Sequence, residues 1–276
     1  MHVLTTVAAV RAARAPLGSI GLVPTMGFLH EGHLSLVRRA KAECGAALVS
    51  IFVNPSQFGE GEDFQSYPRD LRRDLKFLDE AGVDIAFTPS VEAIYPPGFD
   101  TKIDIGAVAR GLEGAARPGH FAGVATVVAK LLNIAQPTRA YFGQKDAQQA
   151  AVIQRLARDL DFACEIVIAP TVREADGVAM SSRNAYLSAS ERQAATVLIG
   201  ALTAAQASFS AGEARAAKLK ATMLEALSAE PLARADYVSI ADPHTLAELS
   251  VARRGALVSL AVRIGPARLI DNLHLG

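Results

Sequence analysis

Short apolar runs alternate with amphipathic, helix-like stretches along the first 170 residues, and this alternation limits the possible folds more than any other feature of the chain. Apolar runs of this length between turn residues are typical of strands that are buried on both faces of a sheet. Because parallel strands are joined by helical crossovers, the alternation predicts a mostly parallel sheet with helices on both faces. Strands are predicted at residues 19–23, 46–53, 83–87, 101–105, 140–142 and 165–169, and helices at residues 33–43, 68–80, 121–135 and 146–160.

The pattern changes near Arg173, and we place the boundary of a smaller second domain around residues 171–187. Ser188 and Ser210 are each followed three residues later by glutamate, which is the capping-box signature of a helix start. The fold predicted is α/β, with a Rossmann-like, doubly wound, mostly parallel sheet in residues 1–174 and a smaller α+β C-terminal domain in residues 175–276. In the second domain, helices are predicted from the first signature to about residue 209 and over residues 214–229, and strands at residues 237–240, 256–262 and 268–272.

The charge balance and the apolar content restrict the partners that this chain can have. Its 276 residues contain 28 Lys and Arg against 28 Asp and Glu, so the net charge gives no reason to expect nucleic acid or an anionic membrane as a partner. No apolar run reaches the roughly 20 residues of a transmembrane helix, and residues 1–14 lack the layout of a signal peptide. The two cysteines have no metal or redox spacing, so a cytoplasmic enzyme is expected.

Two histidines, His30 and His33, follow the first long apolar run and a glycine-containing turn. A lone histidine is more often structural, but a pair beside Gly32, in a chain with six histidines, favours a functional role. Backbone amides at a helix start together with two imidazoles suit the phosphates of a nucleotide. A zinc site is an alternative, since two histidines at this spacing can share one face, but no nearby Cys or carboxylate has the spacing of a third ligand.

Polar residues also follow two other predicted strands, at the ends where ligands bind in open α/β sheets. Asn54 and Gln57 carry amides that suit a small hydroxy acid, although turn chemistry explains Asn54 equally well. Lys145 opens a predicted helix and could pair with a phosphate, with Gln149 one turn further along the same surface. Asp146 could cap that helix or accept hydrogen bonds from ribose hydroxyls.

Three further polar segments carry weaker signals. Ser181 and Ser182 followed by Arg183 would make a compact anion receptor, although such a run alone usually marks an exposed loop. The basic loop at residues 117–121 is expected to have a supporting role only. The carboxylates of Asp63, Asp70 and Asp74, together with nearby arginines, are expected to lie on a solvated helix face.

Taken together, these motifs resemble the pantothenate synthetase (pantoate–β-alanine ligase) family of the nucleotidylyltransferase superfamily. The resemblance runs through most of residues 20–190, and the remaining C-terminal part fits the family's second domain in size and layout. One departure is Gln144, where the family often has glutamate before Lys145 and Asp146. The matching stretches are residues 24–33, 52–58, 117–124 and 181–184.

The resemblance implies an ATP-dependent ligase with two half-reactions. The carboxylate of pantoate would attack the α-phosphate of ATP, which gives pantoyl adenylate and pyrophosphate. The amine of β-alanine would then attack the activated carbonyl, which releases AMP and pantothenate. Adenylation supplies the leaving group, so no covalent enzyme nucleophile is needed, and catalysis would depend on alignment and charge stabilisation. The family also implies Mg²⁺ on the phosphates, a homodimer, ATP and pantoate binding by residues 1–174, and a lid formed by residues 175–276.

The family's functional residues can be placed on the matching positions of this chain. The expected catalytic residues are His33, His30, Lys145 and Arg183, with His33 as the proton donor. Pantoate is expected at Gln57, Gln149 and Asn54. No protein residue is named as a metal ligand. The residues expected to bind ATP are Met26, Gly27, Phe28, Leu29, His30, Glu31, Gly32, His33, Gly143, Gln144, Lys145, Asp146, Val172, Met180, Ser181, Ser182 and Arg183.

Two other functions remain open on the sequence. Another nucleotidylyltransferase would keep the histidine pair and residues 181–183, but would not need Gln57 and Gln149 together. A nucleotide sensor without catalytic activity would bind ATP and release no pyrophosphate. A role like that of an aminoacyl-tRNA synthetase is disfavoured by the zero net charge and by the lack of an evident tRNA-binding extension.

Overall fold

The computed structural model describes residues 1–276, which divide into two compact units. The first unit comprises residues 1–143 and 152–170, and the second comprises residues 144–151 and 171–276. The short segment 144–151 thus belongs with the C-terminal part of the chain, although strands of the first unit precede and follow it. None of the helices combines the length and the apolar character that a membrane span requires.

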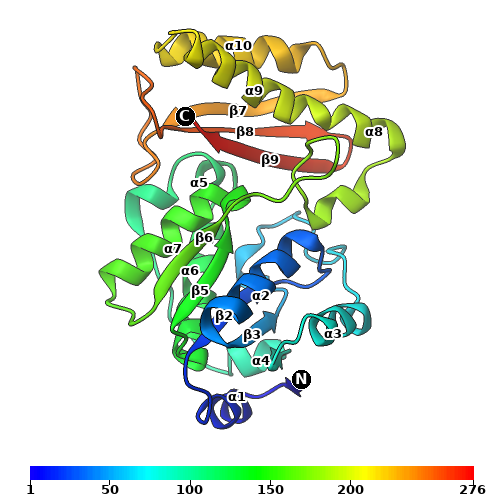
Figure 1. Ribbon diagram of the computed structural model, residues 1–276, viewed down its shortest axis with the longest axis vertical. Coiled ribbons are helices and arrows are strands. Elements are labelled where there is room, and N and C mark those ends of the chain that lie inside the picture. The colour runs from blue at the N-terminus through cyan, green and yellow to red at the C-terminus, as the bar shows by residue number, and fades with distance from the viewer. The chain divides into compact units, whose positions relative to one another are not determined.

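The first unit is built on a six-stranded sheet in which every pair of neighbouring strands is parallel (Figure 1). The strand order is β1-β4-β3-β2-β5-β6, so the chain changes direction across the sheet between β2 and β5. Such a switch point is where ligands bind in open α/β sheets. The strands are β1 (His2–Leu4), β2 (Ile20–Thr25), β3 (Ala46–Ile51), β4 (Ile85–Phe87), β5 (Arg139–Gly143) and β6 (Glu165–Ala169).

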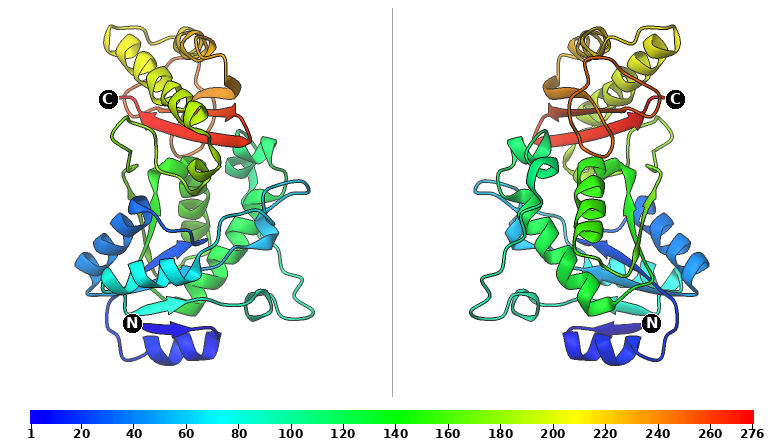
Figure 2. Two further views of the ribbon diagram at one scale, coloured as in Figure 1. Left: turned by 90° about the vertical axis from the view of Figure 1, so that its right-hand side faces the viewer. Right: turned by 90° about the vertical axis from the view of Figure 1, so that its left-hand side faces the viewer.

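Helices cover both faces of this sheet, which confirms the predicted doubly wound architecture. On one face, α2 and α3 bury Val37 and Leu78 against Val23, Val49 and Tyr141 of the strands. On the other face lie α1 and α6 (Figure 2). The longer helices are α1 (Val7–Arg14), α2 (Glu31–Cys44), α3 (Leu71–Glu80), α6 (His120–Ala135) and α7 (Ala147–Asp159), of which α7 is shared between the units; the shorter elements are α4 (Val91–Ile94), α5 (Glu113–Ala116) and the 3₁₀ turns η1 (Pro55–Gln57), η2 (Gly106–Ala109) and η3 (Gln144–Asp146).

The second unit is the predicted smaller α+β domain. Its three strands form an antiparallel sheet in the order β7-β8-β9. Two helices pack on this sheet and bury Leu202, Leu219 and Met223 against Val258 and Leu260. The elements are η4 (Ser182–Tyr186), α8 (Ala189–Ala194), α9 (Thr196–Ser210), α10 (Ala216–Ser228), β7 (Ala233–Ala241), β8 (Leu257–Ile264) and β9 (Ala267–His274).

Several local predictions were wrong. Residues 101–105 form no strand, and the amide of Ile103 donates instead to the Thr126 hydroxyl of α6 at 3.1 Å. The second capping box does not form either, because Ser210 is the last residue of α9 and the Glu213 carboxylate accepts from the amide of Arg215. The single long helix predicted up to residue 209 is divided into α8 and α9. The N-terminal β1 and α1 were not predicted.

Candidate functional site

The segments that follow β2 and β3 lie side by side at the carboxyl edge of the parallel sheet. Thr25 and Ile51 are paired in the last register position of the two strands, and the amide of Phe52 donates to the Thr25 carbonyl at 3.0 Å. Beyond this pair, Nε2 of Gln57 approaches the Met26 sulfur at 3.3 Å. Two predicted motifs far apart in the sequence therefore meet where β2 and β3 end.

The loop after β2 makes a tight turn before α2. Gly27 has a φ of +83°, and a Cβ there would lie 3.0 Å from both the Asp74 carboxylate and the Ile51 side chain. Phe28 also adopts a positive φ, of +50°, which is costly for a residue with a side chain. The hydroxyl of Thr25 accepts from the Gly27 amide at 3.2 Å. The surrounding structure must therefore hold this loop in place.

Asp74 of α3 supplies that restraint. Its carboxylate accepts from the amides of Phe28 at 2.7 Å and Leu29 at 2.8 Å, and the residue is 1% exposed. Burial raises the pKa of Asp74, and the hydrogen bonds from the Leu29 and Phe28 amides oppose that rise. The prediction that Asp74 lies on a solvated face was therefore wrong; Asp70, by contrast, is exposed and caps α3.

Arg73, the neighbour of Asp74, packs against the same loop. Its guanidinium lies over the rings of Phe28 and Phe77, with its carbon 5.0 Å and 4.8 Å from the ring centroids, and it donates to the Leu29 carbonyl at 3.0 Å. Its Nη1 atom is buried without a hydrogen-bond partner. The loop thus has a buried anion that holds its amides and a cation that covers its aromatic ring.

His30 and His33 cap the start of α2 reciprocally. Nδ1 of His30 accepts from the Gly32 amide at 3.2 Å, and Nδ1 of His33 accepts from the His30 amide at 3.3 Å. The two rings lie 4.0 Å apart between centroids. A ring nitrogen that accepts a hydrogen bond carries no hydrogen, so each neutral imidazole has its hydrogen on Nε2. Both rings are therefore held as Nε2–H donors.

The caps also decide which groups of this loop can meet an anion. The amides of Phe28, Leu29, His30 and Gly32 all donate to side chains of the chain itself. The sequence suggested phosphate binding by backbone amides at the helix start, but these four amides are already engaged. Each imidazole has an Nε2–H group, which is a donor of the kind that phosphate oxygens accept from.

Asn54 organises the turn that carries Gln57. It is 1% exposed, and its Nδ2 donates to Oε1 of Gln57 at 3.1 Å and to the Gly123 carbonyl at 3.2 Å. Its Oδ1 accepts from the hydroxyls of Ser56 and Tyr95, both at 2.9 Å. With these bonds on both ends of its amide, Asn54 orients the Gln57 side chain. Gln57 itself is 8% exposed.

Helix α6 packs unusually close to this turn. A Cβ at Gly123 would lie 2.2 Å from the Ser56 carbonyl oxygen, so only glycine allows the approach. From the segment before and at the start of α6, Arg117 and His120 both donate to the Gln57 carbonyl, at 3.3 Å and 2.8 Å. The basic loop thus contacts the backbone of Gln57 directly.

His120 is neutral in this arrangement. Burial and the neighbouring Arg117 guanidinium lower the pKa of His120 from its ordinary 6.5 to about 4. Nε2 of the neutral ring accepts from Arg117 at 3.1 Å, so Nδ1 carries the hydrogen that is donated to Gln57. Arg117 is itself paired with Glu62 at 2.5 Å, and this contact lowers the pKa of the Glu62 carboxyl. Gln57 is therefore fixed through its backbone as well as its side chain.

The second unit holds the predicted residues that follow Gly143. The Lys145 ammonium lies 3.6 Å from the Asp146 carboxylate, in the turn η3 that leads into α7. Asp146 is the last residue of η3 and directly precedes α7, and Gln149 is half-buried in the first turn of that helix. Both carbonyls at the start of η3, from Gln144 and Lys145, accept from the side chain of Asn272 in β9.

A hairpin gathers the other predicted residues of this unit. The amide of Met180 donates to the Val172 carbonyl at 3.0 Å. Directly after it, the Ser181 hydroxyl caps η4 by accepting from the Arg183 amide at 3.3 Å, and Ser182 is buried. The Ser181 hydroxyl that was expected to bind an anion is thus also a local structural cap.

The predicted site residues thus fall into two groups, one in each unit. The first unit contains residues 26–33, Asn54, Gln57 and Gly143; the second contains Gln144, Lys145, Asp146, Gln149, Val172, Met180 and residues 181–183. Nowhere in the chain do three or more His, Cys, Asp or Glu side chains gather in a way that could hold a metal ion.

Sequence reasoning missed the side chains that hold these groups. Asp74, Arg73 and Tyr95 support the first group, and Asp271 and Asn272 support the second. Only Asp74 left a detectable signal, because it precedes the fully buried Leu78 by one helical turn and so lies on the buried stripe of α3. The others belong to no motif.

The chain is similar to known proteins over its whole length. The sequence profile of the family described as "Pantoate-beta-alanine ligase" matches residues 2–274. Among curated proteins, the pantothenate synthetase of Herpetosiphon aurantiacus is 61% identical over 274 residues, which is 99% of each chain. That of Roseiflexus sp. (strain RS-1) is 61% identical over 276 residues, which is 100% of this chain and 99% of the relative.

Solved structures show the same similarity in three dimensions. The crystal structure of pantothenate synthetase from Thermus thermophilus has a TM-score of 0.96 and 51% identity, and the match covers 100% of this chain and 99% of that one. A pantoate-beta-alanine ligase from Francisella tularensis was solved in complex with "Beta-gamma ATP and Beta-alanine". It has a TM-score of 0.82 and 34% identity, with 99% of this chain and 97% of that chain covered.

Proposed function

The chain belongs to the pantoate–β-alanine ligase family, and from this premise we propose how its own residues perform the family's reaction. It is an ATP-dependent ligase that condenses pantoate with β-alanine through pantoyl adenylate. A carboxylate oxygen of pantoate attacks the α-phosphorus of ATP, and the bond to the β-phosphate breaks to release pyrophosphate. The β-alanine amine then attacks the carbonyl carbon, and the bond to AMP breaks. The enzyme contributes position and charge stabilisation.

The observation that carries this assignment of roles is the reciprocal histidine cap. Because Nδ1 of each ring accepts from a backbone amide, His30 and His33 present Nε2–H donors of fixed orientation. We assign these donors to the phosphate oxygens of ATP, where negative charge develops as pyrophosphate leaves. His33 is the proton donor of the pair. Met26, Gly27, Phe28, Leu29, Glu31 and Gly32 form the rest of this ATP-binding segment.

Gln57 is assigned to the pantoate hydroxyls and carboxylate. Its carbonyl is held by Arg117 and His120 and its side chain by Asn54, so its amide is preorganised for a small polar ligand. The closeness of Met26 to Gln57 supports binding of the acid and the nucleotide at neighbouring positions. Asn54 and Gln149 complete the proposed set of pantoate residues.

The second group is assigned to the nucleotide. Lys145 pairs with the phosphates, and Asp146 accepts from the ribose hydroxyls. Arg183 stabilises charge on the triphosphate. Lys145 and Arg183 are positively charged, and positive charge favours the binding of negatively charged phosphates, which supports these roles. The remaining proposed ATP contacts are Gly143, Gln144, Val172, Met180, Ser181 and Ser182.

Three further properties belong to this proposal. Mg²⁺ would neutralise the triphosphate and be held mainly by phosphate oxygens and water. The enzyme is proposed to act as a homodimer. We place it in the cytoplasm, where ATP is abundant and free thiols such as those of the two cysteines persist.

The test separates the two half-reactions. Pyrophosphate release is measured with ATP and pantoate alone, and AMP release is then measured after β-alanine is added. The expected result is a first burst that depends on pantoate and a second that depends on β-alanine. Pyrophosphate release with a different acid, and none with pantoate, would indicate another nucleotidylyltransferase. ATP binding without any pyrophosphate would indicate a sensor.

A further inference from the structure

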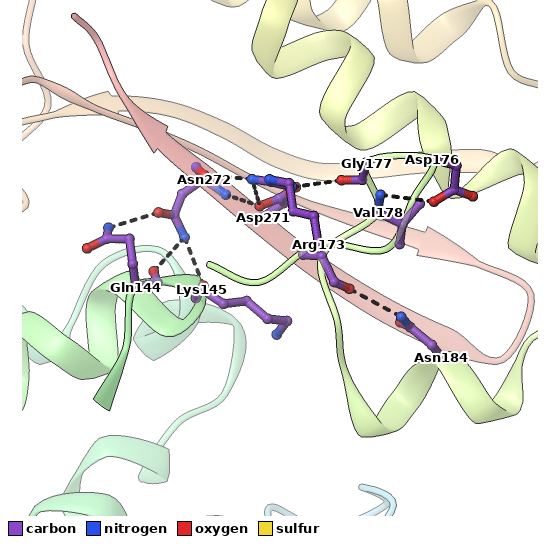
Figure 3. Close-up of polar contacts among 10 residues, drawn as sticks. Gln144, Lys145, Arg173, Asp176, Gly177, Val178, Asn184, Asp271 and Asn272 are labelled. Atoms are coloured by element: carbon purple, nitrogen blue, oxygen red, sulfur yellow. Dashed lines mark hydrogen bonds and ion pairs between the residues drawn. The ribbon is translucent and has the colours of Figure 1, made fainter. Parts of the chain in front are cut away.

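Asn272 of β9 reaches the backbone of the turn that carries Lys145 (Figure 3). It is 4% exposed, and its Nδ2 donates to the carbonyls of Gln144 at 3.0 Å and Lys145 at 2.8 Å. Its Oδ1 accepts from Nε2 of Gln144 at 2.9 Å. Both hydrogens of the amide thus meet carbonyl oxygens 127 and 128 positions away in the sequence. The two carbonyls also fix the orientation of the Asn272 amide.

The preceding residue, Asp271, holds the hairpin of the same unit. It is 2% exposed, and its carboxylate accepts from Arg173 twice, at 2.6 Å and 3.0 Å. Arg173 also donates to the Gly177 carbonyl at 3.0 Å, within the hairpin. Asp271 accepts from the amide of Asn272 at 2.8 Å, so the two residues brace each other. Two consecutive residues of β9, Asp271 and Asn272, therefore hold both segments of the second unit that we assign to the nucleotide, which are η3 and the hairpin that contains Arg173 (Figure 3).

Asn272 contacts the backbone carbonyl of Lys145 and not the lysine side chain. Figure 3 shows the Lys145 side chain extending away from Asn272. Its ammonium lies 3.6 Å from Asp146, and no hydrogen bond joins it to β9. A substitution of the lysine side chain would therefore leave the carbonyl that Asn272 binds. This separation makes the two functions of residue 145 experimentally distinct.

We propose that Asn272 is a positioning residue, which fixes the backbone of η3 and thereby sets where the Lys145 ammonium meets a phosphate. The inference rests on the proposed role of Lys145 in ATP binding. Gln144 completes the arrangement, because its amide donates to the Asn272 oxygen. A glutamate at position 144 would place its carboxylate against that oxygen, with two acceptors facing each other. Glutamine at this position is therefore matched to Asn272.

The test is a double-mutant cycle with ATP affinity as the readout, measured by titration calorimetry. Asn272→Ala should weaken ATP binding about 10-fold in the otherwise unchanged enzyme, because a displaced charge loses its ideal distance to the phosphate. In the Lys145→Ala background the same change should weaken binding less than about 2-fold. Both backgrounds should lose the same amount of unfolding free energy, since the carbonyl at position 145 is present in both.

A matched control lies opposite Asn272 in the sheet. Ser259 of β8 is paired in register with Asn272, and its buried hydroxyl has no hydrogen-bond partner. Ser259→Ala changes the packing of the same sheet without touching η3, so ATP affinity should stay unchanged. If Asn272→Ala does not fold, Asn272→Ser, whose hydroxyl can keep one of the two donations, takes its place in the cycle.

The outcomes separate this inference from the proposed function. A loss of affinity that is large with lysine at position 145 and small with alanine there would support the positioning role. An equal loss of ATP affinity in both backgrounds, or no loss in either, would overturn the positioning role while Lys145 kept its own. A Lys145→Ala variant that binds ATP normally would refute the role of the lysine itself and the inference with it.

Discussion

The two groups of candidate residues are held in different ways. In the first unit, the histidine loop caps itself through contacts two and three residues apart, and one buried carboxylate, Asp74, fixes the turn before it. In the second unit, two backbone carbonyls of η3 accept hydrogen bonds from Asn272, in a strand more than 120 residues away. The first arrangement is partly local and readable from a motif. The second exists only once the C-terminal sheet has formed.

A motif can be complete in the sequence and still lack the distant residues that position it in the site. His30 and His33 orient each other through the reciprocal cap, and the chemistry that we propose for them uses the same two rings. Lys145 carries a charge, but the hydrogen bond that holds its backbone carbonyl comes from Asn272 of β9. We expect a substitution in the histidine loop to affect the reaction through the substituted residue itself. A substitution of Asn272 in β9 should instead act through Lys145, whose backbone it contacts and whose side chain it does not.

Removal of the Asp74 carboxylate should have the largest effect. Asp74→Ala removes the acceptor of the buried Leu29 amide and of the part-buried Phe28 amide, and at about 1–3 kcal/mol each the unfolding free energy should fall by about 4 kcal/mol. Pyrophosphate release should fall at least about 10-fold, because the turn before His30 loses its restraint. Chemical denaturation and the pyrophosphate assay measure the two effects.

Asp70→Ala is the matched control for that change. Asp70 lies on the same helix and caps it, but it is exposed and does not touch the loop. It should cost about 1 kcal/mol of stability and leave pyrophosphate release unchanged. Equal rates for the two variants would mean that pyrophosphate release does not depend on the Asp74 carboxylate.

Acid should weaken the first unit through His120. Because folding lowers its pKa from 6.5 to about 4, the unfolded chain binds more protons between these pH values, and stability falls as the pH falls through this window. The loss should reach about 3 kcal/mol at the acid end. His120→Asn, which keeps a donor for the Gln57 carbonyl, should remove this part of the pH dependence. The unfolding free energy of His120→Asn is measured by denaturation at several pH values between 6.5 and 4. If it falls with pH as steeply as that of the parent, His120 is not the source of the pH dependence.

The histidine cap is tested by His33→Ala. Pyrophosphate release should fall by a factor of about 10², a typical scale for a positioned proton donor or charge stabiliser, while the chain still folds. His244→Ala, at an exposed histidine of the second unit, should leave the rate unchanged. Near-normal adenylation by His33→Ala would remove this residue from the chemistry and leave it a purely structural cap.

The smallest effect is expected at Gln57. Gln57→Ala should raise the KM for pantoate about 10-fold with little change in the KM for ATP, the scale of one lost hydrogen bond to a charged ligand. Gln65→Ala, an exposed glutamine in the following loop, serves as the comparison and should behave like the parent. A Gln57 variant with unaltered pantoate kinetics would show that its amide serves only the Asn54 network.

Much of the fold was predictable because its signals are local. Alternating apolar runs and helical stretches indicated the parallel sheet, and capping signatures such as Ser188 with Glu191 marked a real helix start. The same signature at Ser210 failed, since its neighbours continue α9 to that residue and Glu213 finds Arg215 instead. Residues 101–105 failed likewise, because Thr126 of α6 supplies a partner that no pattern within the segment reveals.

By itself, the sequence determined the class of fold and the family and named the side chains that we propose for the chemistry, because periodicity and motif spacing are properties of neighbouring residues. The tertiary structure alone decided what holds those side chains in place: the buried Asp74, the neutral His120, and the pairing of Gln144 with Asn272. A polar side chain shows no preference for a partner 45 or 127 positions away until packing removes water and leaves one partner within reach.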